Sequence, residues 1–434
     1  MFKIQTLNKI SLAGLSLLER DKYETASEMT NPDGIILRSF KMHDMELPAS
    51  LLAVARAGAG VNNIPIDKCT EKGIVVFNTP GANANSVKEL VIASMLVASR
   101  NMNPAIDWCK TLADKGDEVP QLVEKGKGQF VGHEIKGKTL GVIGLGAIGV
   151  MVANSASALG MKVIGSDPYI SVDAAWGLSR DIKKAISLDS LIAESDYITV
   201  HVPLTDGTKG MFNADKFKIM KKGTVLLNFA RGGLVKNEDL KAAIENGTIA
   251  TYMTDFPDAE LIGMKNVICV PHLGASTEEA EDNCAAMAAQ QLKDYLEFGN
   301  IKNSVNFPNC SMPFTGRKRI CVINKDIPNV IGQLTAIMAE EKINIAEFIN
   351  KNKNGYAYNI IEIDSEVTDE LMAEVMTKLK AAEGVIAVRL IGRFTLLWSR
   401  PAGSTAGCTP SFPVRRPASW RRQYYRPVFL SAHK

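Results

Sequence analysis

An arginine, a glutamate and a histidine in the second half of the chain each follow an apolar run. Arg231 ends TVLLNFAR before two glycines, Glu260 lies in a proline-containing turn after TIATYMTDF, and His272 follows NVICVP. A guanidinium can hold a carboxylate with two parallel hydrogen bonds, and a histidine oriented by a carboxylate can exchange a hydroxyl proton near neutral pH. A lone histidine is usually structural, but these three residues end successive segments of one expected sheet. The sequence therefore predicts a catalytic group that oxidises an alcohol.

A glycine-rich stretch, KTLGVIGLGAIG, predicts where the electron acceptor binds. Gly144, Gly146 and Gly149 have the spacing G-x-G-x-x-G and lie where a strand turns into a helix, which suits a dinucleotide pyrophosphate at the helix N-terminus. Asp167 ends the next apolar run, eighteen positions after Gly149, about where an acid meets the ribose hydroxyls. An acid there repels a 2′-phosphate, so NAD is favoured over NADP. Asp255 ends a later strand and could hold the nicotinamide carboxamide.

Composition indicates a globular protein. The 434 residues are 46% apolar and 22% charged, enough for a full core in about two to four domains. Seven scattered cysteines without C-x-x-C pairs argue against a disulfide framework or a zinc site and favour a reducing cytoplasm. The apolar run 10–18 is too short to span a bilayer, so we expect the first turns of a core helix and no membrane segment.

The net charge of +3 is unevenly distributed. Residues 393–434 contain eight Lys and Arg and no acid, so the rest of the chain is mildly acidic. Aromatic residues among those arginines could contact nucleic acid. The segment has no periodic apolar face, however, and we expect a basic, disordered tail without a nucleic-acid partner.

The remaining pattern predicts α/β architecture. The first eighty residues alternate apolar runs with helical stretches, which is typical of a parallel sheet, and residues 83–100 predict a long buried helix. Ligands bind at the carboxyl ends of such strands. Arg38, Ser39 and Arg56 stand at those ends and suit an anionic substrate, although each arginine could instead pair with a nearby acid. Beyond residue 138, repeated helix and strand patterns predict a doubly wound sheet.

Five motifs together resemble the D-isomer-specific 2-hydroxyacid dehydrogenases: RAGAGVNNI, GKTLGVIGLGAIG, VHVPLT, LLNFARGG and VPHLGAST. The resemblance covers residues 1 to about 310, and a separate module extends it to about 392. It implies two doubly wound parallel-sheet lobes. A flavodoxin-like substrate lobe would comprise residues 1–98 and 276–310, closed by a helix over 276–300, and a Rossmann NAD lobe would comprise residues 99–275.

The resemblance also implies residue roles. Arg231 would bind the substrate carboxylate, and Glu260 would partner His272, the general acid/base. Substrate phosphate and hydroxyl groups would lie near Arg38, Ser39, Arg56 and Asn83. The implied cofactor residues are Ala59, Gly144, Gly146, Ala147, Ile148, Gly149, Asp167, Val202, Phe229, Ala230, Arg231, Asp255, His272, Leu273, Gly274 and Ala275. Many family members have Arg in place of Ala147, but backbone contacts dominate there, so the change should cost little.

Residues 318–392 read as βαββαβ and resemble an ACT domain, a regulatory unit that pairs with its copy and in many relatives binds serine. Asp326 and Asn344 match the effector positions. Asn329 follows Pro328 where the family usually has glycine, so use of the module for assembly alone stands beside serine inhibition as an alternative. A homodimer or homotetramer is implied.

The implied activity is NAD-dependent oxidation of 3-phospho-D-glycerate to 3-phosphohydroxypyruvate, the first step of serine biosynthesis. A glyoxylate/hydroxypyruvate reductase or a D-lactate dehydrogenase is the alternative among enzymes, and the ACT-like module and Arg38 argue against both. A non-catalytic NAD-sensing binding protein would keep the glycine loop but need not retain Arg231, Glu260 and His272. The catalytic group therefore favours an enzyme.

Overall fold

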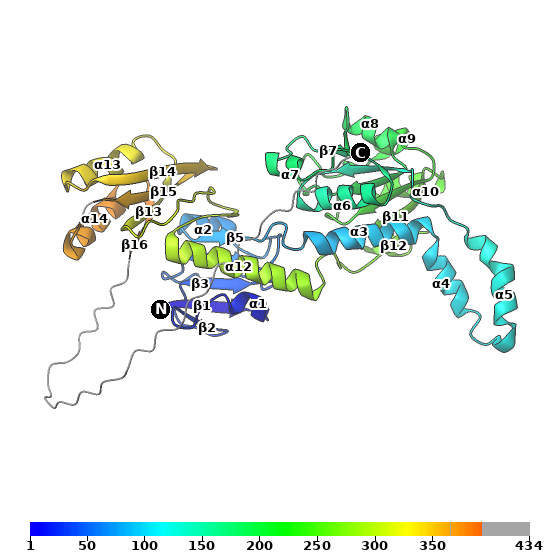
Figure 1. Cartoon of the computed structure of the whole chain (residues 1–434), viewed down its shortest axis with the longest axis horizontal. Coiled ribbons are helices and arrows are strands. Elements are labelled where there is room, and N and C mark those ends of the chain that lie inside the picture. Colours follow the sequence, from blue (N-terminus) through cyan, green and yellow to red (C-terminus); the bar gives the residue numbers. More distant parts are fainter. Residues whose placement is uncertain (365, 393–434) are drawn as a thin grey trace, which may run out of the picture. The chain divides into compact units, whose positions relative to one another are not determined.

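A computed structural model describes residues 1–364 and 366–392. The described chain forms a five-stranded sheet, a seven-stranded sheet and a four-stranded sheet, with helices between the strands (Figure 1). The expected fold class, two parallel-sheet α/β lobes and a smaller βαββαβ module, is confirmed. The predicted basic tail lies outside the described residues.

The five-stranded sheet is parallel, in the order β2-β1-β3-β4-β5. Its strands are β1 (Phe2–Leu7), β2 (Tyr23–Ala26), β3 (Gly34–Leu37), β4 (Ala53–Arg56) and β5 (Val75–Phe77). The core helix expected over residues 10–18 is only the four-residue α1 (Leu12–Leu15), in which Gly14 is buried and Leu12 is 79% exposed. The short α2 (Ile66–Glu71) precedes β5.

One long helix, α12 (Glu278–Phe298), returns from the other lobe to pack on this sheet and on α1. Thr277 caps its N-terminus through the amide of Ala280, and Gly299 ends it in the left-handed conformation, with φ of +72°. Its alanine-rich buried side shares one core with Ile4, Ile36 and Phe77 of the sheet. The predicted closing helix is therefore observed.

The seven-stranded sheet is parallel, in the order β12-β11-β10-β9-β6-β7-β8. The order reverses between β6 and β9, which creates the crevice where doubly wound sheets bind ligands. Its strands are β6 (Thr139–Ile143), β7 (Lys162–Ser166), β8 (Lys183–Lys184), β9 (Tyr197–Val200), β10 (Thr224–Asn228), β11 (Ile249–Thr254) and β12 (Val267–Cys269).

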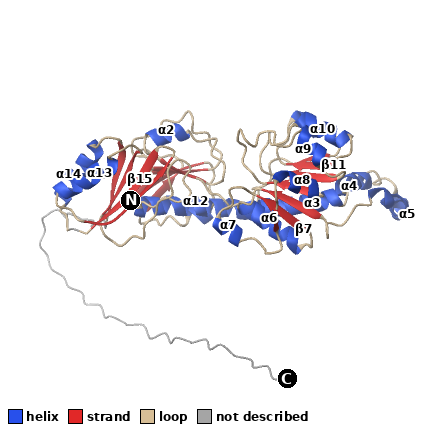
Figure 2. Ribbon diagram, turned by 90° about the horizontal axis from the view of Figure 1, so that it is seen from above, coloured by secondary structure: helices blue, strands red, loops and turns tan. Residues whose placement is uncertain are grey.

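Helices cover both faces of this sheet (Figure 2). One core includes α3 (Ala84–Ser99) and α6 (Ala147–Ala158), and the other includes α8 (Leu188–Glu194), α9 (Ala214–Ile219) and α10 (Asn237–Glu245). Two shorter helices, α7 (Val172–Trp176) and α11 (Ala259–Ile262), follow β7 and β11.

The charged segment that follows α3 is largely helical. It continues α4 (Met102–Lys110) into α5 (Val119–Gly126), with 3₁₀ turns at Gly116–Glu118 and Lys127–Phe130. These helices and turns bury none of their residues, and their main ring contact joins Trp108 to Phe130 at 5.3 Å. Local contacts such as this one, rather than a buried core, therefore hold these helices together.

The four-stranded sheet is antiparallel, in the order β14-β15-β13-β16. Its elements are β13 (Arg319–Lys325), α13 (Val330–Glu340), β14 (Ile345–Lys353), β15 (Tyr356–Ile363), α14 (Asp369–Ala381) and β16 (Val385–Ile391). Ile320 and Val322 face the helices, whereas Cys321 and Ile323 join the core of the five-stranded sheet. Both faces of this small sheet are thus covered.

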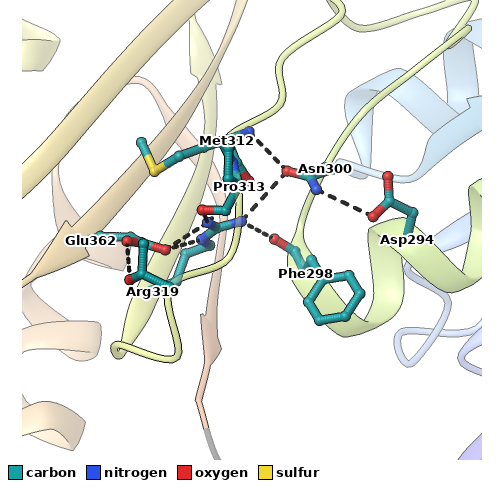
Figure 3. A network of polar contacts seen from close by, with 8 residues as sticks. Asp294, Phe298, Asn300, Met312, Pro313, Arg319 and Glu362 are labelled. Atoms are coloured by element: carbon teal, nitrogen blue, oxygen red, sulfur yellow. Dashed lines mark hydrogen bonds and ion pairs between the residues drawn. The ribbon is translucent and has the colours of Figure 1, made fainter. Parts of the chain in front are cut away.

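A buried arginine fastens the start of this module to the segment after α12 (Figure 3). Arg319 is fully buried, and its Nη1 donates to the carbonyl of Phe298 at 2.6 Å. Its Nη2 donates to the carbonyls of Met312 at 3.1 Å and Pro313 at 2.9 Å. Nη2 also lies 2.6 Å from Oε1 of the buried Glu362. The buried charge is therefore paired and hydrogen-bonded.

A second set of contacts holds the same junction. The hydroxyl of Tyr358 donates to the carbonyl of Gly299 at 2.6 Å, and the Arg389 guanidinium lies 4.3 Å from the centre of the Tyr295 ring. A side chain at Gly299 would place a Cβ 2.3 Å from the sulfur of Cys321. Glycine is thus required there by close packing as well as by φ.

Candidate active site

The three glycines of the predicted dinucleotide loop have three distinct roles. Gly144 follows β6 with φ of +92°, and a Cβ there would lie 2.7 Å from the carbonyl of His201. A Cβ on Gly149 would lie 1.9 Å from the carbonyl of Gly144, so only glycine lets α6 pack this closely. At Gly146 no described heavy atom lies within 4 Å of an added Cβ. The open space lies where a pyrophosphate must approach.

Gly146 is also the N-cap of α6, and within the described chain no side chain caps this helix. Its first N–H groups can therefore donate to a phosphate. Asp167 follows β7 and supports the loop, because its Oδ2 accepts from the amide of Leu145 at 2.8 Å. The predicted ribose acid thus stands beside the glycine turn. Ala147 and Ile148 form the first turn of α6, and Val202 lies 3.0 Å from the ideal Cβ position of Gly144.

Asn228, which the sequence analysis did not single out, shapes the turn that carries Arg231. It ends β10 and is buried, and its Nδ2 donates to the carbonyl of Arg231 at 2.9 Å. Its Oδ1 accepts from the amide of Ala230 at 3.2 Å. Arg231 is exposed, and its Nη1 donates to the carbonyl of Ala230 at 2.7 Å. In the sequence, Asn228 could have been noticed as the polar residue that ends the apolar run of β10.

Asp255 carries an unused acceptor. The residue is 1% exposed, and its Oδ2 accepts from the amide of Gly274 at 3.2 Å. Its Oδ1 is buried, and none of the described residues donates to it. Burial raises the pKa of Asp255, against the smaller lowering effects of Gly274, His272 and Arg231. A buried acceptor without a donor fits the predicted role, which is to bind the carboxamide of a nicotinamide.

His272 is exposed and held by its backbone. Its φ is +44°, and its amide donates to the carbonyl of Asp255 at 3.0 Å. The imidazole ring lies against Phe256, with centroids 4.7 Å apart. The left-handed backbone is uncommon for a non-glycine residue and directs attention to this turn.

His201, the other histidine at a strand end of this sheet, cannot take the same role. Its Nε2 lies 3.0 Å from the hydroxyl of Thr199, while among the described residues nothing pairs with its buried Nδ1. Burial lowers the pKa of His201 to about 4. The ring is therefore neutral at pH 7 and poorly placed to exchange protons with a solute.

Glu260 is not brought to His272. The carboxylate of Glu260 accepts from Nδ2 of Asn237 at 3.0 Å, and the same nitrogen donates to Asp258 at 2.9 Å. Among the described contacts none joins Glu260 to the imidazole. The expected pair is thus absent from this structure, because Asn237 of α10 offers the carboxylate a closer donor.

Arg231, His272 and the predicted substrate residues, which come from both lobes, line one cavity of about 1410 Å³. Its lining includes the predicted residues Arg38, Ser39, Arg56, Ala59, Asn83, Arg231, His272 and Ala275. Glu260 lines a separate cavity of about 640 Å³. Phe229 is buried beneath the turn, and Leu273 is 42% exposed. The cavity therefore brings the imidazole of His272 together with three guanidinium groups.

Two of these arginines already have partners. Arg38 pairs with Glu281 of α12 at 2.5 Å, and the carbonyl of Arg38 accepts from Nε of Arg56 at 3.1 Å. Burial lowers the pKa of Arg56, although an arginine remains charged at neutral pH. Ser39 is held through its amide, which donates to Oδ1 of Asn8 at 3.0 Å. Arg38 thus has the acidic partner that the sequence left open as an alternative to substrate binding. The pair is exposed, so it contributes little stability.

The predicted effector residues lie at opposite ends of the small sheet. Asp326 follows the end of β13 and Asn344 precedes the start of β14, and these two strands run in the same direction. Oδ2 of Asp326 accepts from Asn352 at 3.0 Å, and the carbonyl of Asn344 accepts from the amide of Asp364 at 3.0 Å. Asn329 has φ of +69°. This left-handed conformation explains why glycine suits the position, and asparagine adopts it more readily than most other residues.

Two kinds of feature, a membrane-spanning helix and a metal-binding cluster, are absent from the described part of the chain. No helix there is long and apolar enough to cross a bilayer. Nor do three or more His, Cys, Asp or Glu side chains gather there to hold a metal ion.

Comparisons with known proteins agree with this geometry. Residues 92–274 match the NAD-binding domain of the D-isomer-specific 2-hydroxyacid dehydrogenases. A D-3-phosphoglycerate dehydrogenase of Haemophilus influenzae is 30% identical over 387 residues, which cover 86% of this chain and 90% of the relative. One from Methanocaldococcus jannaschii is 34% identical over 337 residues, covering 76% of this chain. This chain spans only 61% of the length of that relative and 54% of one from Archaeoglobus fulgidus.

A solved structure shares the fold. The NAD+-bound 3-phosphoglycerate dehydrogenase of Entamoeba histolytica is 27% identical, with a TM-score of 0.55, and the match covers 70% of this chain and 98% of that one. Residues 92–274 are thus the NAD-binding domain, as the glycine loop predicted. The chain belongs to the family of D-isomer-specific 2-hydroxyacid dehydrogenases.

Proposed function

We propose that the chain catalyses the NAD-dependent oxidation of 3-phospho-D-glycerate to 3-phosphohydroxypyruvate, the first step of serine biosynthesis. The observation that carries this proposal is the single cavity that contains His272, Arg231, Arg38 and Arg56. One imidazole can serve the hydroxyl, and three guanidinium groups exceed what a lone carboxylate needs. The names of the similar D-3-phosphoglycerate dehydrogenases support the same substrate.

The residues present fit NAD. The open space at Gly146, the uncapped start of α6 and the unused Oδ1 of Asp255 match a pyrophosphate and a carboxamide. Asp167 would accept from the ribose hydroxyls. When bound, NAD supplies the ring that accepts the hydride leaving C2 of the substrate.

The residues of this chain would do the rest. Arg231 grips the carboxylate and orients C2, and Arg56, with Arg38, receives the phosphate. Ser39 and Asn83 remain proposed contacts to phosphate or hydroxyl oxygens. His272 takes the hydroxyl proton as hydride leaves, and returns it in the reverse reaction. Glu260 keeps its proposed role of steadying the imidazolium, which requires its carboxylate to exchange Asn237 for the ring.

We further propose the boundaries 1–98 with 276–310, 99–275 and 318–392 for the substrate lobe, NAD lobe and ACT domain. A homodimer or homotetramer in the cytoplasm is part of the same proposal. The exposed helices α4 and α5 offer apolar side chains such as Met102 and Ile106 to a second copy. For serine we propose the positions Asp326 and Asn344, one at each end of the small sheet, and assembly alone remains the alternative for the module.

The test is a substrate panel followed by NADH absorbance. We expect 3-phospho-D-glycerate to be oxidised with a higher kcat/KM than glycerate, glycolate or D-lactate, because only it engages Arg38 and Arg56 through a phosphate. Each assay is repeated with L-serine to test the effector proposal. Preference for an acid without a phosphate would overturn the substrate assignment, and no turnover of any acid would point to a binding protein.

Replacing Arg231 with lysine should lower kcat/KM about tenfold to a hundredfold although the charge is kept. Lysine cannot make two parallel hydrogen bonds to a carboxylate. Steady-state kinetics with 3-phospho-D-glycerate measure the change. The matched control is Arg180→Lys, at an exposed arginine outside the cavity. Equal kinetics for the two variants would remove Arg231 from substrate binding.

A further inference from the structure

We propose that Asn78, Gln291 and Asn303 form a positioning cluster that fixes the loop 57–60 at the active-site cavity. We call these three side chains the amide cluster. None of them lines the cavity of His272 and Arg231, so the cluster acts through the loop. The kinetic part of the inference rests on the proposed function, whereas its structural part does not.

The three residues are connected by hydrogen bonds that pass through the backbone carbonyl of Asn78. Nδ2 of Asn303 donates to Oε1 of Gln291 at 2.8 Å, and Nε2 of Gln291 donates to the carbonyl of Asn78 at 3.0 Å. Nδ2 of Asn78 then donates to the carbonyl of Ala59 at 2.7 Å. Gln291 is 7% exposed and uses both ends of its side chain. Because a buried amide costs free energy when unpaired, these hydrogen bonds favour one arrangement.

The cluster joins parts of the chain that are far apart in sequence. Asn78 directly follows β5, Gln291 lies in α12, and Asn303 lies beyond the end of α12. Asn303 has φ of +59°, and its carbonyl accepts from the amide of Asn78 at 3.4 Å. The backbone of Asn78, at the end of β5, is thus held by the side chain of Gln291 in α12 and by the backbone of Asn303 beyond it.

The loop held by the cluster determines where Arg56 lies. A Cβ at Gly58 would stand 2.3 Å from Nη1 of Arg56, so the guanidinium packs directly on this glycine. The amide of Gly58 donates to the hydroxyl of Thr79 at 2.8 Å. The carbonyl of the following residue, Ala59, accepts from Asn78. Thr79 and Asn78 thus fix adjacent residues of the loop, and a shift there would move Arg56 away from the substrate.

The same helix carries the attachment of the C-terminal module. Phe298 and Tyr295, at the end of α12, accept hydrogen bonds from Arg319 and Arg389. Gln291 lies one turn before Tyr295 on this helix. Helix α12 therefore contacts the C-terminal module at its end and, through the amide cluster, the loop beside the cavity.

The test compares Gln291→Met with Gln290→Met. Gln290 is the neighbouring residue on α12, is exposed, and its side chain makes no hydrogen bond to the described residues, so it is a matched control. Methionine keeps the length of Gln291 and removes both hydrogen bonds. For Gln291→Met we expect KM for 3-phospho-D-glycerate to rise about tenfold, the equivalent of roughly one net hydrogen bond, with kcat within about twofold.

Hydrogen–deuterium exchange of the wild-type chain and both variants provides a readout independent of activity. Peptides covering residues 53–62 should exchange faster in Gln291→Met and at the wild-type rate in Gln290→Met. Asn303→Gly, which keeps the left-handed backbone and removes only the donor, should give the same change if Gln291→Met does not fold. Exchange or KM values that match the control would overturn the inference. If no acid is oxidised by the wild type, the proposed function fails and exchange alone decides on the cluster.

Discussion

Replacing His272 with alanine should lower kcat by about a hundredfold to ten-thousandfold, the usual contribution of a positioned general acid or base. His272 lies in the same cavity as Arg231 and Arg56, whereas the other strand-end histidine, His201, is neutral and buried. The described cavity wall holds His43 as its only other imidazole, and it belongs to the substrate lobe. Initial rates of NADH formation across a pH series measure the loss.

The control for this variant is His133→Ala, because His133 is exposed and contributes only its backbone to a hydrogen bond. We expect kcat to fall in His272→Ala and to stay at the wild-type value in the control. The affinity for NADH, measured by fluorescence, should change little, since Asp255 and the glycine loop are intact. Near-normal turnover in His272→Ala would assign the proton transfer to another group.

Replacing Arg319 with leucine should destabilise the chain by about 3–5 kcal/mol, the range for removing one partner of a buried ion pair. The change leaves the carboxylate of Glu362 buried without its cation. It also leaves the carbonyls of Phe298, Met312 and Pro313 without this donor. Urea denaturation followed by circular dichroism gives the free energy of unfolding.

Arg317→Leu is the matched control, because Arg317 lies two residues away and pairs with Asp364 at 3.4 Å with both side chains about half exposed. Such a pair contributes about 0–1 kcal/mol. Equal destabilisation of the two variants would show that the junction does not depend on the buried pair. A double variant with Glu362→Leu should recover part of the loss, since the uncompensated carboxylate is then removed.

Glu362 gives the same junction a pH dependence. Burial alone would raise the pKa of its carboxyl group, but hydrogen bonds from Thr315 and Arg319 and the charge of Arg319 hold it below the ordinary value of 4.5. A lowered folded-state pKa contributes stability that is complete above the unfolded-state pKa and is lost as pH falls through the folded-state pKa. The stability difference between wild type and Glu362→Gln should therefore shrink as the solution is acidified below about pH 4.

Much of the fold was predictable because its signals are local. The periodicity of residues 83–100 gave α3, and the glycine spacing at Gly144, Gly146 and Gly149 gave the turn from β6 into α6. β2 was not predicted, because Tyr23 is its only buried residue and an exposed edge strand has little apolar alternation.

The site was less predictable where it depends on contacts between distant residues. Spacing identifies Arg231 and His272 as strand-end residues, but it cannot show that Asn237 binds Glu260. Nothing in the sequence distinguishes Gln291 from other glutamines in helices, because its partner Asn78 is far away along the chain. The unbroken apolar run 320–323 is the sequence signal that both faces of the small sheet are covered, and the first six residues of β13, from Arg319 onward, are buried.

The covering of that sheet on both faces also bears on how such a module can be inherited or exchanged. Cys321, Ile323, Tyr358 and Ile360 of β13 and β15 share one core with the five-stranded sheet, which is formed by the first eighty positions of the chain. A regulatory cassette grafted in their place would have to reproduce this apolar surface together with Arg319 and its carbonyl partners. Loss of the module at this boundary would expose that apolar surface of the five-stranded sheet to water, so the surface has to change whenever the module does.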